Sequence, residues 1–96
     1  MQQILDLKRQ IASNDSEIQR TQMQINTIVQ DQGRIRENIN SLNRVAGQEQ
    51  QVQNYSRQLA AQESQLATQR DQLAQLQQKK TALEAQLNSL IEKMEF

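Results

Sequence analysis

Cysteine, histidine, proline and tryptophan are all missing from this chain of 96 residues, and aromatic residues make up only 2% of it. Without cysteine or histidine, the chain has no disulfide, no thiol nucleophile, no imidazole acid–base group and none of the usual thiolate or imidazole zinc ligands. Without proline, no residue forces a helix to end. The hydrophobic content of 35% is low for a thick globular core but sufficient for a narrow seam between long helices.

The chain also lacks an excess of charge of either sign. Its 11 basic and 11 acidic residues are well mixed and give zero net charge, so no basic face for nucleic acid or an anionic membrane is indicated. No apolar run is long enough to span a membrane, and the N-terminus lacks the apolar core of a signal peptide. We therefore expect no nucleic-acid binding and no membrane insertion, and the sequence indicates no compartment.

Apolar residues recur with the spacing of a coiled coil, in which positions a and d of each heptad form the seam. In the first half, position a holds Ile4, Ile11, Ile18, Ile25 and Ile39, and position d holds Leu7, Ile28, Ile35 and Leu42. In the second half, position a holds Val45, Val52, Leu59, Leu66, Leu73, Leu87 and Met94, and position d holds Tyr55, Leu76, Leu83 and Leu90. The chain is therefore predicted to be all-α.

The two halves do not share one heptad frame, because the frame slips by one residue close to Gly47. Such a slip occurs within continuous coiled-coil helices, and it also occurs where two helices meet at a turn. Gly47 favours the turn, since glycine readily adopts the left-handed backbone conformation that ends a helix. We predict one domain over 1–96, a long antiparallel two-helix coiled-coil hairpin with arms at about 2–45 and 48–95 and a turn at about 44–49.

Core polarity supports a turn at Gly47. A chain reversal there places Asn14 opposite Lys80 and Gln32 opposite Gln62, so that polar seam positions coincide. A buried polar group without a partner costs about 1–3 kcal/mol, which favours such matching. Two layers are mixed, Ile25 with Gln69 and Thr21 with Leu73. On the flanks, the pairing also sets Glu17 opposite Lys79 and Lys8 opposite Glu84. We interpret Asn14, Lys80, Gln32 and Gln62 as residues that set the register.

Two alternatives remain open at this point. The chain could form one continuous helix in a parallel dimer and act as an oligomerisation module. The first arm could also be shorter, because residues 13–16 form a cap-like Ser-Asn-Asp-Ser segment.

No sequence feature indicates catalysis or ligand binding. The carboxylates are scattered over outer helical positions, which is typical of a solvated face. We therefore expect no enzyme activity, no cofactor, no metal site and no small-molecule ligand. The most distinctive segment is 31–39, which is charge-dense and close to the predicted turn. Its Arg34 and Arg36, with Glu63 on the other arm, could contact a partner at the tip, although a contact between Arg36 and Glu63 inside the hairpin is favoured.

Two patterns carry a family resemblance: residues 31–39, read as DQxRIRENI, and the later run of Tyr55, Gln58, Leu59, Gln62, Glu63 and Leu66. With the ending at 90–96, they resemble the C-terminal helical coiled-coil region of large uncharacterised bacterial proteins, in which a β-rich domain of unknown function precedes the helices. Gly33 departs from the bulkier residue of that pattern. The resemblance implies that this chain is a module of a larger bacterial protein, and it implies no activity.

One side of the predicted hairpin carries small and apolar residues beside the seam. They are Leu5, Ala12, Val29, Ala60, Ala67, Ala74 and Ile91. Small side chains permit close helix approach, so this side is a candidate dimer face that would join two hairpins into a four-helix assembly. An equally good reading is that alanine is simply the best helix former. The sequence thus predicts a non-enzymatic spacer or protein–protein interaction module whose partners are proteins, including a second copy of itself.

Overall fold

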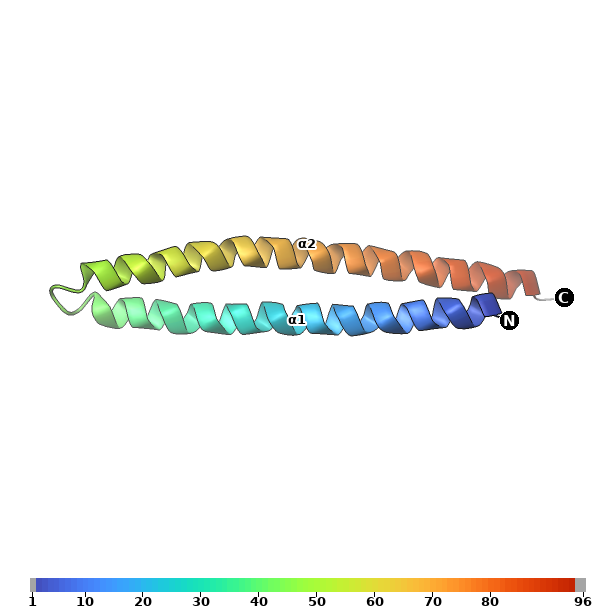
Figure 1. Cartoon of the computed structure of the whole chain (residues 1–96), viewed down its shortest axis with the longest axis horizontal. Coiled ribbons are helices and arrows are strands. Elements are labelled where there is room, and N and C mark those ends of the chain that lie inside the picture. Colours follow the sequence, from blue (N-terminus) through green and yellow to red (C-terminus); the bar gives the residue numbers. More distant parts are fainter. Residues whose placement is uncertain (1, 95–96) are drawn as a thin grey trace. The chain divides into compact units, whose positions relative to one another are not determined.

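A computed structural model describes residues 2–94, in two helices with no strand among them: α1, Gln2–Leu42, and α2, Glu49–Met94 (Figure 1). Glu95 and Phe96, at the end of the predicted second arm, lie outside the described residues. The chain divides into two compact units. Unit 1 combines residues 2–22 of α1 with residues 71–94 of α2, and unit 2 comprises the continuous segment 23–70. Each unit is a pair of antiparallel helical segments.

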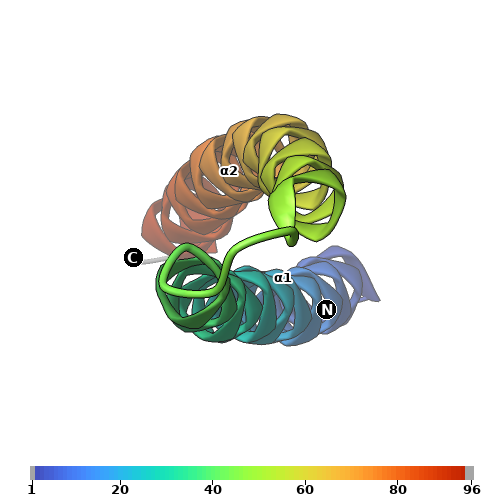
Figure 2. The same cartoon turned by 90° about the vertical axis from the view of Figure 1, so that its left-hand side faces the viewer.

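The connection between the helices lies in unit 2 and spans residues 43–48 (Figure 2). At its start, the backbone N–H groups of Arg44 and Val45 donate to the carbonyls of Ser41 and Leu42, at 3.3 and 3.0 Å. These bonds join residues three apart, so the helix ends in a tighter turn. Gly47 then has φ +87°, and no other described residue has a positive φ. The predicted turn at Gly47 is therefore confirmed, and it reflects the freedom of glycine in this conformation.

The start of α2 follows directly from this turn. The carbonyl of Gln48 accepts a hydrogen bond from the N–H of Val52 at 3.1 Å, which is the first bond of the new helix. Glu49 lies in the first turn of α2 and Lys93 in its last. Both charges have the sign that stabilises the helix dipole at that end.

The first helix is shorter than predicted, ending at Leu42 rather than near 45. Val45, which the heptad pattern assigned to the seam, instead lies in the connection and is 54% exposed. Met94 was also assigned to the seam and is 47% exposed at the end of α2. Both assignments are wrong: Val45 lies between the two helices, and Met94 is the last residue of α2.

In unit 2, the seam consists of the predicted a and d positions. Ile35 and Leu66 are each 2% exposed, and Gln32 is also buried. The remaining seam residues of this unit are half-buried: Ile25, Ile28, Ile39, Leu42, Val52, Tyr55, Leu59, Gln62 and Gln69. Most other positions of the unit are exposed, so the period of the apolar residues fixes which stripe of each segment faces the other.

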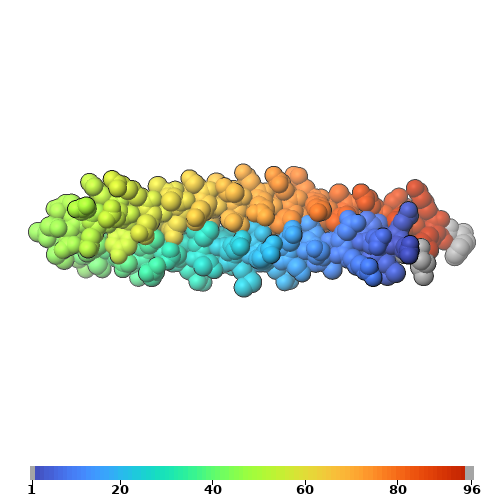
Figure 3. All heavy atoms as spheres, viewed as in Figure 1, coloured from blue at the N-terminus to red at the C-terminus, as the bar shows by residue number. Residues whose placement is uncertain are grey.

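Unit 1 has the same construction, and its two segments, blue and orange to red in Figure 3, lie against each other. Leu7, Leu76 and Leu83 form its buried apolar core, together with the buried polar residues Asn14 and Thr21. Its half-buried seam positions are Ile4, Ile11, Ile18, Leu73, Lys80, Leu87 and Leu90. Residues 13–16 are helical, so α1 has no break there. The alternative in which the first arm is interrupted at these residues is therefore wrong. The fold is the predicted all-α helical hairpin, and the alternative of one uninterrupted helix is wrong because residues 43–48 are not helical.

Candidate functional site

Polar side chains of both arms converge on the seam of unit 2. The Nε2 of Gln32 donates to Oε1 of Glu63 at 3.0 Å, and the Nε2 of Gln62 donates to Oδ2 of Asp31 at 2.7 Å. Each glutamine thus bonds the carboxylate next to the opposite glutamine, and the two bonds cross the seam in opposite directions. The predicted register role of Gln32 and Gln62 is consistent with this pattern, but the glutamines bond carboxylates and not each other.

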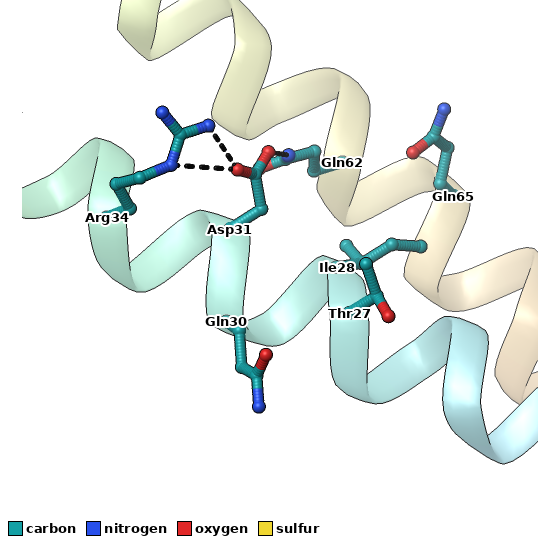
Figure 4. Close-up of a pocket in the computed structure, with 7 residues that line it drawn as sticks. All are labelled: Thr27, Ile28, Gln30, Asp31, Arg34, Gln62 and Gln65. Carbon is teal, nitrogen blue, oxygen red and sulfur yellow. Dashed lines mark hydrogen bonds and ion pairs between the residues drawn. The ribbon is translucent and has the colours of Figure 1, made fainter.

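Asp31 is the centre of this cluster, and Figure 4 shows it in close-up with Arg34 and Gln62. Its Oδ1 accepts a bond from Nε of Arg34 at 3.1 Å and pairs with the same guanidinium through Nη2. These bonds from Arg34, followed by the one from Gln62, lower the pKa of Asp31, and the carboxylate in turn raises the pKa of Arg34. Asp31 therefore joins a surface arginine of α1 to a seam residue of α2.

Glu63 has the corresponding place on the other arm. Besides accepting from Gln32, its Oε1 lies 3.8 Å from Nη2 of Arg36. The favoured contact between Arg36 and Glu63 inside the hairpin is therefore confirmed. Both side chains are about 60% exposed, so the ion pair itself contributes little to stability. The tip contact with a partner, which used Arg34, Arg36 and Glu63, stays a prediction, and all three residues already have partners within the chain.

A second polar layer lies in unit 1. The Nδ2 of the buried Asn14 donates to the backbone carbonyl of Leu76 on α2 at 2.8 Å. Lys80 pairs with Oδ1 of Asp15 at 3.1 Å. Polar contacts therefore cross the seam at both Asn14 and Lys80, but the two residues do not bond each other. Asn14 bonds Leu76, one helical turn before Lys80, and Lys80 pairs with Asp15, the residue after Asn14.

Sequence reasoning missed the roles of Asp15 and Asp31. Each is adjacent in sequence to a polar seam residue, Asn14 or Gln32, and this adjacency is the signal that could have identified both. The flank pairs that were predicted, Glu17 with Lys79 and Lys8 with Glu84, form no ion pair within 4.0 Å in the described structure. Ion pairs at such positions contribute about 1 kcal/mol or less, so the pairing of the arms does not depend on them.

The polar layers are only partly satisfied. Within residues 2–94, the Oδ1 of Asn14 and the Oε1 atoms of Gln62 and Gln69 are buried without a hydrogen-bond partner. Gln69 belongs to the mixed layer predicted opposite Ile25. Unpaired buried oxygens reduce stability, so these layers are retained at an energetic cost.

The candidate dimer face is exposed throughout. Leu5, Val29 and Ile91 are 52%, 44% and 41% exposed, and its alanines, Ala12, Ala60, Ala67 and Ala74, are exposed as well. Neither described helix is long and apolar enough to cross a membrane. Residues 2–94 contain no group of three or more acidic side chains placed to hold a metal ion.

Comparison with known protein families, curated proteins and solved structures gives no match to this chain. The resemblance to the helical region of large bacterial proteins therefore stays a prediction.

Proposed function

We propose that this chain is a non-enzymatic coiled-coil hairpin that acts as a spacer and protein–protein interaction module of a larger bacterial protein. The observation that carries the proposal is the seam. Within residues 4–42 and 52–90 the a and d positions are buried or half-buried, and most outward positions are exposed. Most large apolar side chains are therefore used to pair the arms, as a spacer requires, and the bacterial origin rests on the resemblance alone.

The polar contacts support the same role. Gln32, Gln62 and Asn14 each bond across the seam, and any other alignment of the arms would leave their buried amides without these partners. Buried polar residues at seam positions commonly specify the alignment of coiled coils. A module with a fixed register can hold attached protein parts at a constant distance.

The acidic residues support a role without catalysis. Asp15, Asp31 and Glu63 pair with Lys, Arg or Gln side chains. Among residues 2–94, the other carboxylates are exposed except that of Glu17, which is half-buried. A general acid or base requires a convergent site that positions it against a reacting group. The separate placement of these carboxylates favours a structural function.

A distance measurement on α1 tests the spacer role. Gln3 and Ser41 are exposed, and the chain contains no native cysteine that would compete for labels. Spin labels at both sites should give one narrow distance distribution near about 57 Å, from a rise of about 1.5 Å per residue. A broad distribution centred well below that value would contradict the proposal, because a flexible arm cannot set a distance.

A further inference from the structure

The strongest unexplained surface lies in unit 1, on the side of the candidate dimer face. A hollow of about 520 Å³ opens there between the arms. Ile11, Ala12 and Leu87 supply its apolar lining, and its charged lining comes from Lys8, Asp15 and Glu84. Leu5 lies seven residues before Ala12 and Ile91 four residues after Leu87, so helical periodicity places both beside this hollow. The exposure of these two large apolar residues has no role in pairing the arms.

Among the charged residues that line this hollow, Lys8 and Glu84 have no ion-pair partner within residues 2–94. Asp15 is already paired with Lys80. Lys8 and Glu84 line the same hollow from opposite arms, yet no ion pair within 4.0 Å involves either of them in the described part of the chain. The surface therefore offers one free cation on α1 and one free anion on α2.

We propose that a second copy of this chain binds this surface, with the two copies parallel and related by a two-fold axis along the arms. The inference deepens the proposed interaction function and rests on it. In this arrangement, α1 of one copy lies over α2 of the other, so each contact occurs twice. Lys8 of one copy then faces Glu84 of the partner subunit, and Leu5 faces the partner's Ile91.

The levels of these residues along the arms agree with that pairing. The Asp15–Lys80 contact fixes the alignment of α1 and α2 in unit 1. Counting from it in opposite directions along the arms, Lys8 is level with residue 87 and Leu5 with residue 90. Glu84 therefore lies three residues from the level of Lys8, an offset of about 5 Å along the arms. Ile91 lies one residue from the level of Leu5, an offset of about 1.5 Å. Lysine and glutamate side chains span such an offset, and the small Ala12 beside them permits close approach of the helices.

Charge reversal separates this arrangement from other modes of association. By sedimentation equilibrium from micromolar to millimolar concentration, the wild-type chain should dimerise. Lys8→Glu alone and Glu84→Lys alone should each raise the dimer dissociation constant roughly tenfold, because two attractive pairs become repulsive. Mixing these two variants should restore dimers, since every contact between the unlike chains is then attractive. The Lys8→Glu/Glu84→Lys double variant should also dimerise like the wild type.

Controls keep folding and binding apart. Glu17→Lys reverses a charge on the opposite flank and should leave the dissociation constant unchanged. Leu5→Gln and Ile91→Gln should weaken the dimer while helical circular dichroism is retained. A wild-type chain that stays monomeric at millimolar concentration overturns the inference, as does a dimer that the charge reversals do not affect. The spacer proposal has its own test, the label distance on α1, and would survive either result.

Discussion

At the scale of single residues, the two glycines occupy opposite backbone environments. Gly33 lies inside α1, and a Cβ atom added there would meet no heavy atom within 4 Å. Gly47 has the same open surroundings but a φ of +87°. Any difference between the two positions on substitution therefore comes from the backbone and not from packing.

We expect Gly33→Ala to stabilise the chain by about 0.5–1 kcal/mol, because alanine has the higher helix propensity. We expect Gly47→Ala to destabilise it by about 1–2 kcal/mol, because alanine disfavours the left-handed conformation. Urea denaturation followed by circular dichroism measures both changes, and each variant is the matched control of the other. Equal effects of the same sign would show that residue 47 does not adopt this conformation.

Asp31 gives a prediction that depends on pH. Hydrogen bonds from Arg34 and Gln62 lower its pKa in the folded chain, so the carboxylate contributes stability above its ordinary pKa of about 3.9. That contribution is lost as the pH falls through the lowered value. Asp31→Asn should therefore be less stable than the wild type at pH 7, and this difference should shrink in strong acid.

The control for this measurement is Asp71→Asn, which changes an exposed aspartate that makes no ion pair or side-chain hydrogen bond in the described structure. Its urea midpoint should stay close to that of the wild type at pH 7. A difference between Asp31→Asn and the wild type that stays constant from pH 7 to pH 2 would refute the role given to the carboxylate.

At the scale of the helices, stability should come from the seam and not from the connection. Leu66 is 2% exposed in the core of unit 2, whereas Val45 is 54% exposed between the helices. Leu66→Ala should cost about 2–3 kcal/mol, the lower part of the range for buried leucines, because a two-helix seam collapses easily around a lost side chain. Val45→Ala should change the free energy of unfolding by less than about 0.5 kcal/mol. A large loss of stability in Val45→Ala would show that the side chain of Val45 is buried after all.

The sequence predicts the seam well because burial follows one simple period. Every a and d position between Ile4 and Leu42, and between Val52 and Leu90, is buried or half-buried. The end of α1 was harder to predict, because residues 43–46 contain no strong helix breaker. The helix ends there because the chain must turn back to pair its two arms, and the local sequence does not mark that residue. Val45 was misassigned for that reason.

The ion pair of Arg36 with Glu63 was predicted as a contact, but the buried polar residues were predicted as layers and not as bonds. The sequence placed Gln32 opposite Gln62, while the structure bonds them to Glu63 and Asp31. Heptad position predicts which residues face each other, but the rotamer of each glutamine decides whether it bonds the opposite glutamine or the carboxylate beside it. Charged acceptors also form stronger hydrogen bonds than neutral amides. This difference explains why both glutamines donate to carboxylates.

At the scale of the whole molecule, the central claim is that the chain reverses direction and pairs its own arms. Asp6 and Ser89 line one hollow in unit 1, although they are far apart in sequence. Spin labels attached to cysteines at these two positions, measured after dilution with unlabelled chain, report the distance within one molecule. We predict a distance below about 25 Å, given helix axes about 8–10 Å apart. A continuous helix would separate the labels by roughly 125 Å, and the loss of the short distance on dilution would contradict the hairpin.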